Sequence, residues 1–176
     1  MRSKRGPSPG LLKKCRLIRM VIMDVDGVLS DGRIILGGNG SEYKAFDAHD
    51  GFGIDRASRK GMKFAIVTGR TSRATSMRAR ELGVAELHQG IKDKAIVIRQ
   101  VGMKHGLRNS ELCYIGDDDF DLPALSWVGL SAAPCDAMPN VLGSVDYVTR
   151  AHGGRGAVRE VVDMILTAQN LLEAAE

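Results

Sequence analysis

Six aspartates closely follow two apolar stretches of this sequence, residues 17–23 and residues 112–115. They are Asp24 and Asp26 after the first stretch, and Asp117, Asp118, Asp119 and Asp121 after the second. Carboxylates that converge repel one another unless a cation lies between them. Oxygen ligands without histidine or cysteine favour Mg²⁺, which keeps several of its waters. These aspartates therefore predict a magnesium site.

A hydroxyl and two cationic side chains occupy comparable places elsewhere in the chain. Thr68, Gly69 and Arg70 follow the apolar residues 64–67, and Lys94 begins a later helical pattern. Beside a magnesium ion, such groups can hold and neutralise the oxygens of a transferring phosphoryl group. A carboxylate can attack phosphorus to form an aspartyl-phosphate. The combination predicts phosphoryl-transfer chemistry.

Each of these signatures also has an ordinary structural explanation. The Asp-x-Asp-Gly sequence at residues 24–27 and the Gly-Asp-Asp sequence at residues 116–118 are common in turns and loops. Thr68 can merely cap a helix, and Lys94 can be one of many solvated lysines. Their shared position favours a site, because ligands of open parallel sheets bind outside the carboxyl ends of the strands.

The elements that must position these residues are short apolar runs alternating with helical patterns. The runs that predict strands are residues 17–23, 64–67, 84–88, 112–115, 129–133 and 147–148. The helical patterns cover residues 72–82, 94–105 and 158–172. Such alternation predicts an α/β fold, Rossmann-like and doubly wound, with a mostly parallel sheet covered on both faces.

One segment departs from this alternation, directly after the first predicted strand. Residues 33–36 and 41–46 flank the glycine-rich residues 37–40, which is typical of a β-hairpin. We therefore expect an inserted hairpin over residues 33–46, where a helix would otherwise follow the strand.

The length and the charge distribution divide the chain into a tail and one domain. A chain of 176 residues with 44% hydrophobic and 26% charged residues is typical of a single globular domain. Residues 1–19 carry seven cations and no acid, whereas the remainder carries 18 cations and 21 acids. We expect a basic flexible tail over residues 1–16 and a single domain over residues 17–176.

The net charge of −3 on residues 20–176 argues against a nucleic-acid partner for the domain. A tail that binds nucleic acid or anionic lipid is an alternative to a solvated leader.

The sequence also indicates in which cellular compartment the protein is found. No apolar run approaches the ~18 residues of a membrane span, and none near the start resembles a signal-peptide core. Cys15, Cys113 and Cys135 are scattered without a CxxC spacing, which indicates buried or idle thiols rather than a disulfide or zinc site. We expect a cytoplasmic protein without a membrane partner.

Four motifs resemble those of the haloacid dehalogenase superfamily of phosphotransferases. Residues 24–32, Asp-Val-Asp-Gly-Val-Leu-Ser-Asp-Gly, resemble its first motif, and the other three motifs are matched in order by Thr68, Lys94 and residues 116–118. Within the superfamily, residues 44–51, 114–118 and 153–160 resemble the capless branch that includes the 3-deoxy-D-manno-octulosonate 8-phosphate phosphatases. The resemblance implies a Rossmann-like core without a cap domain and Mg²⁺-dependent hydrolysis of that sugar-acid phosphate through an aspartyl-phosphate, as a step of lipopolysaccharide synthesis.

The same resemblance implies roles for individual residues. Asp24 would be the nucleophile, and Asp26 would be first the general acid and then the base that activates water. The metal would be held by Asp24, the backbone carbonyl of Asp26, and Asp117. The metal's waters or neighbouring side chains would be oriented by Asp118 and Asp121. The phosphoryl oxygens would be bound by Thr68 and Lys94.

Members of this branch are homotetramers in which inserted hairpins pack together and a neighbouring subunit closes each site. The resemblance thus gives the hairpin the place of a cap, and it lets Arg155 reach the site of a neighbour. Residues 153–156 can instead form a simple turn into a helix. The substrate would be bound by residues of several segments: Lys44, His49, Gly69, Arg70 and Arg155.

Within this resemblance, Arg70 and His49 bear on the identity of the sugar. Arg70 favours the eight-carbon keto-deoxy acid over the nine-carbon one, whereas His49 stands where many relatives carry arginine or is simply a loop residue. A broad-specificity sugar phosphatase is a further alternative. A phospho-receiver module would place its acidic pair early in the chain and would not need Asp26, and a non-catalytic subunit with this fold would lack Asp26.

Overall fold

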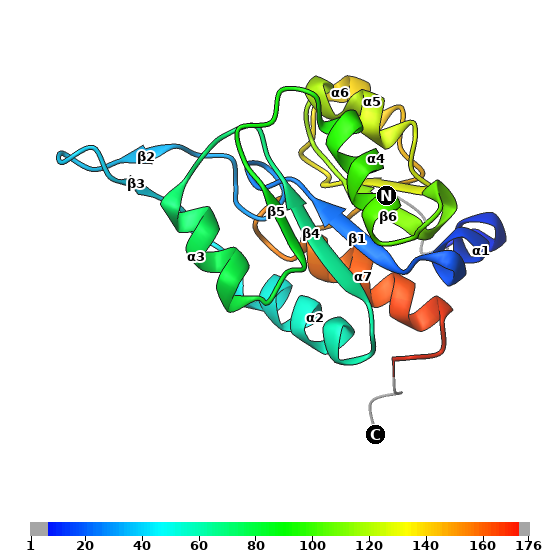
Figure 1. Cartoon of the computed structure of the whole chain (residues 1–176). Helices are drawn as coiled ribbons and strands as arrows, with labels where there is room; N and C mark the ends of the chain where they lie inside the picture. Colours follow the sequence, from blue (N-terminus) through cyan, green and yellow to red (C-terminus); the bar gives the residue numbers. More distant parts are fainter. Residues whose placement is uncertain (1–6, 173–176) are drawn as a thin grey trace.

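The structure, a computed structural model, describes residues 7–172 and has a six-stranded sheet at its centre (Figure 1). The strands are β1 (Met20–Met23), β4 (Lys63–Val67), β5 (Glu86–His88), β6 (Leu112–Ile115), β7 (Leu130–Ala133) and β8 (Tyr147–Val148). Their order is β5-β4-β1-β6-β7-β8, and every neighbouring pair is parallel. The predicted α/β fold with a mostly parallel sheet is therefore confirmed.

Helices cover both faces of this sheet, as Figure 1 shows. They are α1 (Pro9–Leu17), α2 (Ala48–Arg59), α3 (Arg73–Glu81), α4 (Lys94–Lys104), α5 (Leu122–Leu125), α6 (Pro139–Leu142) and α7 (Ala157–Ala168). Side chains of α1, α2, α3 and α7 join one hydrophobic core, and those of α4, α5 and α6 join the other. In the described part of the chain, no helix is both long and apolar enough to cross a membrane.

The central strand shows why the apolar runs in this sequence are continuous rather than alternating. All four residues of β1 are fully buried. Val21 and Met23 pack into one core, whereas Met20 and Ile22 pack into the other, because successive side chains of a strand point to opposite faces.

The predicted hairpin is present directly after the loop that follows β1. Strands β2 (Ile35–Leu36) and β3 (Glu42–Tyr43) pair antiparallel, and they extend well beyond the sheet in Figure 1. Gly40 has a φ of +79° in the turn between them, a conformation that favours glycine. Between β1 and β4, the structure has this hairpin and α2 in place of a separate cap domain.

The expectation of a flexible tail over residues 1–16 is wrong for residues 9–16, which form most of α1. Cys15 is fully buried, and α1 packs against α7. Gln169, which follows α7, donates hydrogen bonds to the carbonyls of Cys15 (3.1 Å) and Ile18 (2.7 Å). The sequence did not predict this helix, because the many cations of the segment outnumber the few apolar residues that form its buried side. Residues 1–6 of the predicted tail lie outside the described residues.

The first strand and helix α2 also differ from the sequence-based expectation. The first predicted strand, residues 17–23, begins only at Met20, because Leu17 still belongs to α1. Helix α2 was not predicted, since Gly51 and Gly53 lower its intrinsic helix propensity. Both glycines are buried, and a Cβ on either would overlap an arginine side chain that packs on the helix.

Candidate active site

The central strands deliver three predicted site residues to one edge of the sheet. Asp24 follows β1, Thr68 follows β4, and Asp117 lies two residues beyond the end of β6. Strands β4 and β6 flank β1 on either side, so the chain reverses its direction of progress across the sheet here. The backbone N–H of Asp24 donates to the carbonyl of Ile115 (3.0 Å), which continues the ladder into the site. This is the switch point at which α/β sheets bind ligands.

Lys94 connects two of the carboxylates that converge here. As the first residue of α4, it lies buried with its Nζ 2.5 Å from Asp24 Oδ2 and 2.6 Å from Asp121 Oδ1. Burial by itself lowers the pKa of Lys94, but the two carboxylates outweigh burial and raise it above its ordinary value. The lysine therefore remains a cation at the centre of the site.

Asp121 organises the loop that follows β6. Its side chain is fully buried and accepts hydrogen bonds from the Tyr114 hydroxyl (2.7 Å) and Lys94 through Oδ1. Its Oδ2 accepts from the backbone N–H groups of Asp117 (2.9 Å) and Asp118 (3.2 Å). With four partners, Asp121 fixes the residues beside it. Tyr114 was not predicted as a site residue, although it belongs to residues 114–118, which carry the family resemblance, and lies three residues before Asp117.

One carboxylate oxygen from each of Asp24, Asp117 and Asp121 lies within 4.8 Å of the other two. Burial raises the pKa of Asp117 to about 8, and the charges of Asp24 and Asp121 contribute to the rise. Burial likewise raises the pKa of Asp24, with Lys94 acting in the opposite direction. A single lysine does not neutralise this cluster. The hard oxygen donors and the excess negative charge fit a magnesium ion.

Gly27 makes this arrangement sterically possible. Its φ is +85°, and a Cβ at this position would overlap the Asp117 carboxylate. The glycine of the first motif therefore brings the loop after β1 against the loop after β6.

A cavity of about 470 Å³ opens beside the carboxylates. Its lining includes eight of the predicted site residues: Asp24, Asp26, Thr68, Gly69, Arg70, Lys94, Asp117 and Asp118. It also includes three residues that were not predicted: Ile91, Lys92 and Phe120. Ile91 and Lys92 lie just before Lys94, and Phe120 lies within the acidic loop, so their closeness to motif residues was an available signal.

Asp26 belongs to a second ionic group that joins the hairpin to the site. Lys44 forms an ion pair with Asp26 Oδ1 and lies 3.2 Å from Glu42 Oε1. Arg70 lies 2.6 Å from Glu42 Oε2 and 3.8 Å from Asp26 Oδ2. Glu42 was not predicted. It lies two residues before Lys44, and this spacing places both side chains on the same side of an extended segment.

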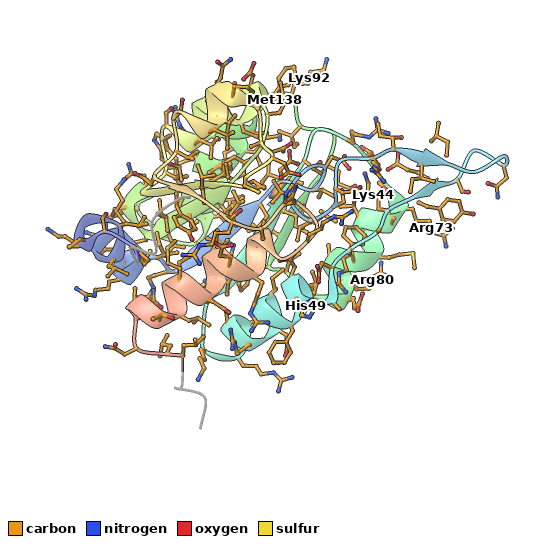
Figure 2. All side chains as sticks on the ribbon, turned by 180° about the vertical axis from the view of Figure 1, so that it is seen from behind. Lys44, His49, Arg73, Arg80, Lys92 and Met138 are labelled. Atoms are coloured by element: carbon orange, nitrogen blue, oxygen red, sulfur yellow. The ribbon has the colours of Figure 1, made fainter. Side chains whose placement is uncertain are left out.

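Two predicted substrate-binding residues lie away from this cavity in the single chain. His49 is at the start of α2, apart from Lys44 in Figure 2, with its ring highly exposed and bonded to Asp47 (2.9 Å). Arg155 lines a separate cavity, together with Asp31 and Arg33. The structure therefore brings together the predicted catalytic and metal-binding residues but not every predicted substrate contact.

Comparisons with known proteins agree with this geometry. A family model described as haloacid dehalogenase-like hydrolase matches residues 83–161. The 3-deoxy-D-manno-octulosonate 8-phosphate phosphatase of Salmonella typhimurium is 45% identical over 172 residues, which cover 97% of this chain and 92% of the relative.

Solved structures extend the agreement to three dimensions. The phosphatase of this type from Yersinia pestis has a TM-score of 0.93 and 42% identity, with 98% of this chain and 94% of that chain covered. The one from Moraxella catarrhalis, solved with magnesium, phosphate and the sugar acid KDO, has a TM-score of 0.89 and 41% identity, with 91% and 92% covered. The chain belongs to the haloacid dehalogenase-like hydrolases and, within them, to the family of 3-deoxy-D-manno-octulosonate 8-phosphate phosphatases.

Proposed function

We propose that this chain hydrolyses 3-deoxy-D-manno-octulosonate 8-phosphate to the free sugar acid and phosphate, with Asp24 as the nucleophile. The observation that carries the proposal is the convergence of Asp24, Asp117 and Lys94 at the switch point of the sheet, open to one cavity. Relatives that share 45% of the sequence over nearly the whole chain carry the name of this activity.

In the first half of the reaction, a carboxylate oxygen of Asp24 attacks phosphorus. The bond between phosphorus and the sugar oxygen breaks, and Asp26 gives that oxygen a proton. Asp26 reaches the same cavity from two residues further along the loop, so it can act on the leaving group while Asp24 holds the phosphoryl group.

In the second half, Asp26 takes a proton from water, and the water oxygen attacks the phosphorus of the aspartyl-phosphate. Phosphate leaves and the Asp24 carboxylate is restored. Lys94 and Thr68 bind phosphoryl oxygens throughout, since both lie buried at the floor of the cavity.

Magnesium would be held by Asp24, Asp117 and the backbone carbonyl of Asp26, and it would stabilise negative charge on the transferring phosphoryl oxygens. Asp121 positions this set through its hydrogen bonds to the Asp117 and Asp118 backbone. Asp118 lines the same cavity and would orient waters of the metal.

Arg70 is the residue we propose for the substrate carboxylate, because it lines the cavity and its guanidinium is partly exposed. Gly69 beside it leaves room for the sugar. Lys44, His49 and Arg155 are further candidates. The nine-carbon keto-deoxy acid phosphate and other sugar phosphates are the alternative substrates.

A homotetramer would complete the site. The hairpin exposes Ile34, Ile35, Leu36 and Tyr43, which suits a surface for association. His49 and Arg155, which lie outside the cavity of their own chain, would contribute to the cavity of a neighbour. We place the enzyme in the cytoplasm, in keeping with the buried thiols of Cys15 and Cys113.

The test is phosphate release in the presence of Mg²⁺ from eight-carbon and nine-carbon keto-deoxy acid phosphates and from neutral hexose phosphates. The eight-carbon acid should be preferred by orders of magnitude, and Asp24→Asn should reduce kcat by roughly 10⁴-fold or more. Asp119→Asn is the matched control, because this exposed carboxylate of the same acidic loop bonds only to Asn140 among the described residues.

Each outcome has a separate meaning. A flat substrate profile with an inactive Asp24→Asn variant would keep the chemistry and reject the specific substrate. Activity that survives in Asp24→Asn would reject the mechanism.

A further inference from the structure

We propose a second metal site, for a thiophilic divalent cation of the Zn²⁺ class, formed by Cys135, Asp136 and His152. One ligand atom of each residue, the thiol sulfur, a carboxylate oxygen and a ring nitrogen, lies within 4.8 Å of the other two. This site is distinct in chemistry from the catalytic cluster, whose candidate ligands are carboxylates.

The ligand set suits zinc rather than magnesium. Zinc binds cysteine, histidine and carboxylate ligands at about 2.0–2.3 Å in a tetrahedron, so that its ligand atoms lie ~3.5 Å apart. His152 Nδ1 and Asp136 Oδ2 are already 3.2 Å apart. The thiol sulfur, which lies within 4.8 Å of both, would move closer to complete three positions, and water would take the fourth.

The backbone that carries these side chains is held by the sheet. The pairing of β7 with β8 continues past both strands, since Thr149 N–H donates to Ala133 (2.9 Å) and Cys135 N–H donates to Ala151 (3.3 Å). Segments separated in sequence by about fifteen residues are thus aligned before any cation binds, which lowers the entropic cost of binding.

Side chains outside the site fix the segment that bears His152. The Glu160 carboxylate accepts hydrogen bonds from the backbone N–H groups of Arg150 (3.0 Å) and Ala151 (3.1 Å). Asp136 Oδ1 accepts from Gly153 N–H (2.9 Å), which leaves Oδ2 directed at the histidine. Contacts of this kind orient metal ligands and strengthen their binding.

Solvent cations can reach these ligands. The His152 ring is 62% exposed and the Asp136 side chain 40% exposed, and both residues border a cavity of about 300 Å³. The Cys135 thiol now donates to the Arg150 carbonyl (3.2 Å). On metal binding the thiol proton would pass to solvent, this hydrogen bond would be lost, and the thiolate would bind the cation.

The site borders the catalytic loop. Gly154 N–H donates to the Val28 carbonyl (2.8 Å), and a Cβ on Gly153 would overlap the carbonyl oxygen of Gly27. On the other side, Met138, labelled in Figure 2, donates its backbone N–H to the Asp117 carbonyl (2.8 Å). A cation here would therefore connect two loops, around residues 135–138 and 152–154, that contact the segments bearing the catalytic aspartates.

Cobalt(II) titration of the full chain with excess Mg²⁺ present tests the proposal. Sulfur bound to cobalt gives a charge-transfer band in the near ultraviolet, which oxygen ligands alone do not produce. We expect this band in the wild type. It should be lost in Cys135→Ser, and in His152→Gln the apparent Kd should rise by at least ~10-fold.

Two variants serve as matched controls. Cys113→Ser removes a fully buried thiol, and His49→Gln removes another exposed histidine that contacts an aspartate. Both should retain the band. Its absence from the wild type at millimolar cobalt, its survival in Cys135→Ser or an unchanged affinity in His152→Gln would overturn the proposal.

A second measurement guards against loss of folding in a variant. Zinc at about 100 times the wild-type Kd should raise the Tm of the wild type by about 5–10 °C and that of His152→Gln by no more than about half as much. An equal rise in both proteins would contradict the assigned site.

Discussion

The edge of the sheet that carries Asp24 and the β2–β3 hairpin are neighbouring regions with opposite character. At the sheet edge, charged groups are buried and contact one another within one chain, since Lys94 and Asp121 each have several partners. In the hairpin, apolar side chains face solvent, and Leu36 is 70% exposed. The comparison teaches that the candidate catalytic groups come together within one chain, whereas the hairpin leaves apolar side chains without cover from that chain.

Ion pairs link the two regions. Lys44, just after β3, forms an ion pair with Asp26 and has a side chain only 1% exposed. The base of the hairpin is therefore anchored to the site, while Ile35 and Leu36, nearer its tip, are largely exposed. The following changes separate the contributions of the two regions, beginning with the largest.

Replacing Lys94 breaks the charge balance at the sheet edge. Lys94→Met keeps the length of the side chain but leaves Asp24, Asp117 and Asp121 without their buried cation. Removal of one partner from a buried ionic group costs ~3–5 kcal/mol. We expect a loss of that size in the free energy of unfolding, measured by urea denaturation with a metal chelator present.

Lys92→Met is the control for this change, because Lys92 lines the same cavity but is exposed. It should alter stability by no more than about 0.5 kcal/mol. Equal effects of the two substitutions would show that the buried cation does not stabilise the carboxylates.

A buried carboxylate away from the site tests the effect of burial without a lysine. Asp50 of α2 is almost fully buried and accepts hydrogen bonds from Gly156 N–H (3.2 Å) and Arg159 N–H (2.7 Å) at the start of α7. Burial raises the pKa of Asp50 from 3.8 to about 6, the nearby charge of Asp47 adds to the rise, and His49 opposes it.

The direction of the pH dependence follows from this shift. Between about pH 4 and pH 6 the folded state holds a proton that the unfolded state has lost, so the free energy of unfolding falls as pH rises. The contribution of Asp50 to this fall is ~3 kcal/mol and is complete above pH 6. Asp50→Asn should remove it, as measured by urea denaturation across this range.

Asp55→Asn changes a carboxylate on the same helix, paired at the surface with Arg59 (3.0 Å). It should leave the slope of stability against pH as in the wild type. If the free energy of unfolding had the same slope against pH in Asp50→Asn and in the wild type, the buried Asp50 carboxylate would not be the source of that slope.

The two regions also differ in how far their structure could be predicted from sequence. Asp24, Asp117 and Thr68 could be placed together because a parallel sheet brings the ends of its strands to one edge. Residues outside these strand ends, whose partners come from distant segments, could not be placed. Glu42 reaches Arg70 across 28 positions, and Asp50 caps a helix more than 100 positions away.

The dependence on distant partners also explains why helices α1 and α2 were not predicted. Helix α1 is stabilised by contacts with α7 and Gln169 at the other end of the chain, and its own composition resembles a basic tail. Helix α2 is stabilised by close packing at Gly51 and Gly53, residues that disfavour an isolated helix. In both cases tertiary packing outweighs local preference.

Placing a charge on the hairpin tests whether its apolar face is covered in solution. Leu36→Glu should shift the molecular mass measured by light scattering from that of an assembly toward that of one chain. Burying an unpaired carboxylate would cost at least ~2 kcal/mol per hairpin. Leu17→Glu is the control, as Leu17 is 47% exposed at the end of α1. An unchanged mass in Leu36→Glu would place the interface elsewhere.

The smallest change concerns the border between the two regions, where Arg70 lies between the cavity and Glu42 of the hairpin. If Arg70 binds the substrate carboxylate, Arg70→Gln should raise KM for the eight-carbon acid phosphate about tenfold, which corresponds to ~1.4 kcal/mol. KM for a neutral hexose phosphate should not change, because that substrate has no carboxylate.

Arg73→Gln provides the matched comparison, since Arg73 is an exposed arginine at the start of α3, three residues away (Figure 2). A rise in KM for both classes of substrate in Arg70→Gln would mean that Arg70 acts through Glu42 and the hairpin rather than on the carboxylate. Because Glu42 also contacts Lys44, and Lys44 contacts Asp26, that result should be accompanied by a lower kcat. The split between KM and kcat therefore decides whether the hairpin contributes to recognition of the substrate or to the position of the general acid.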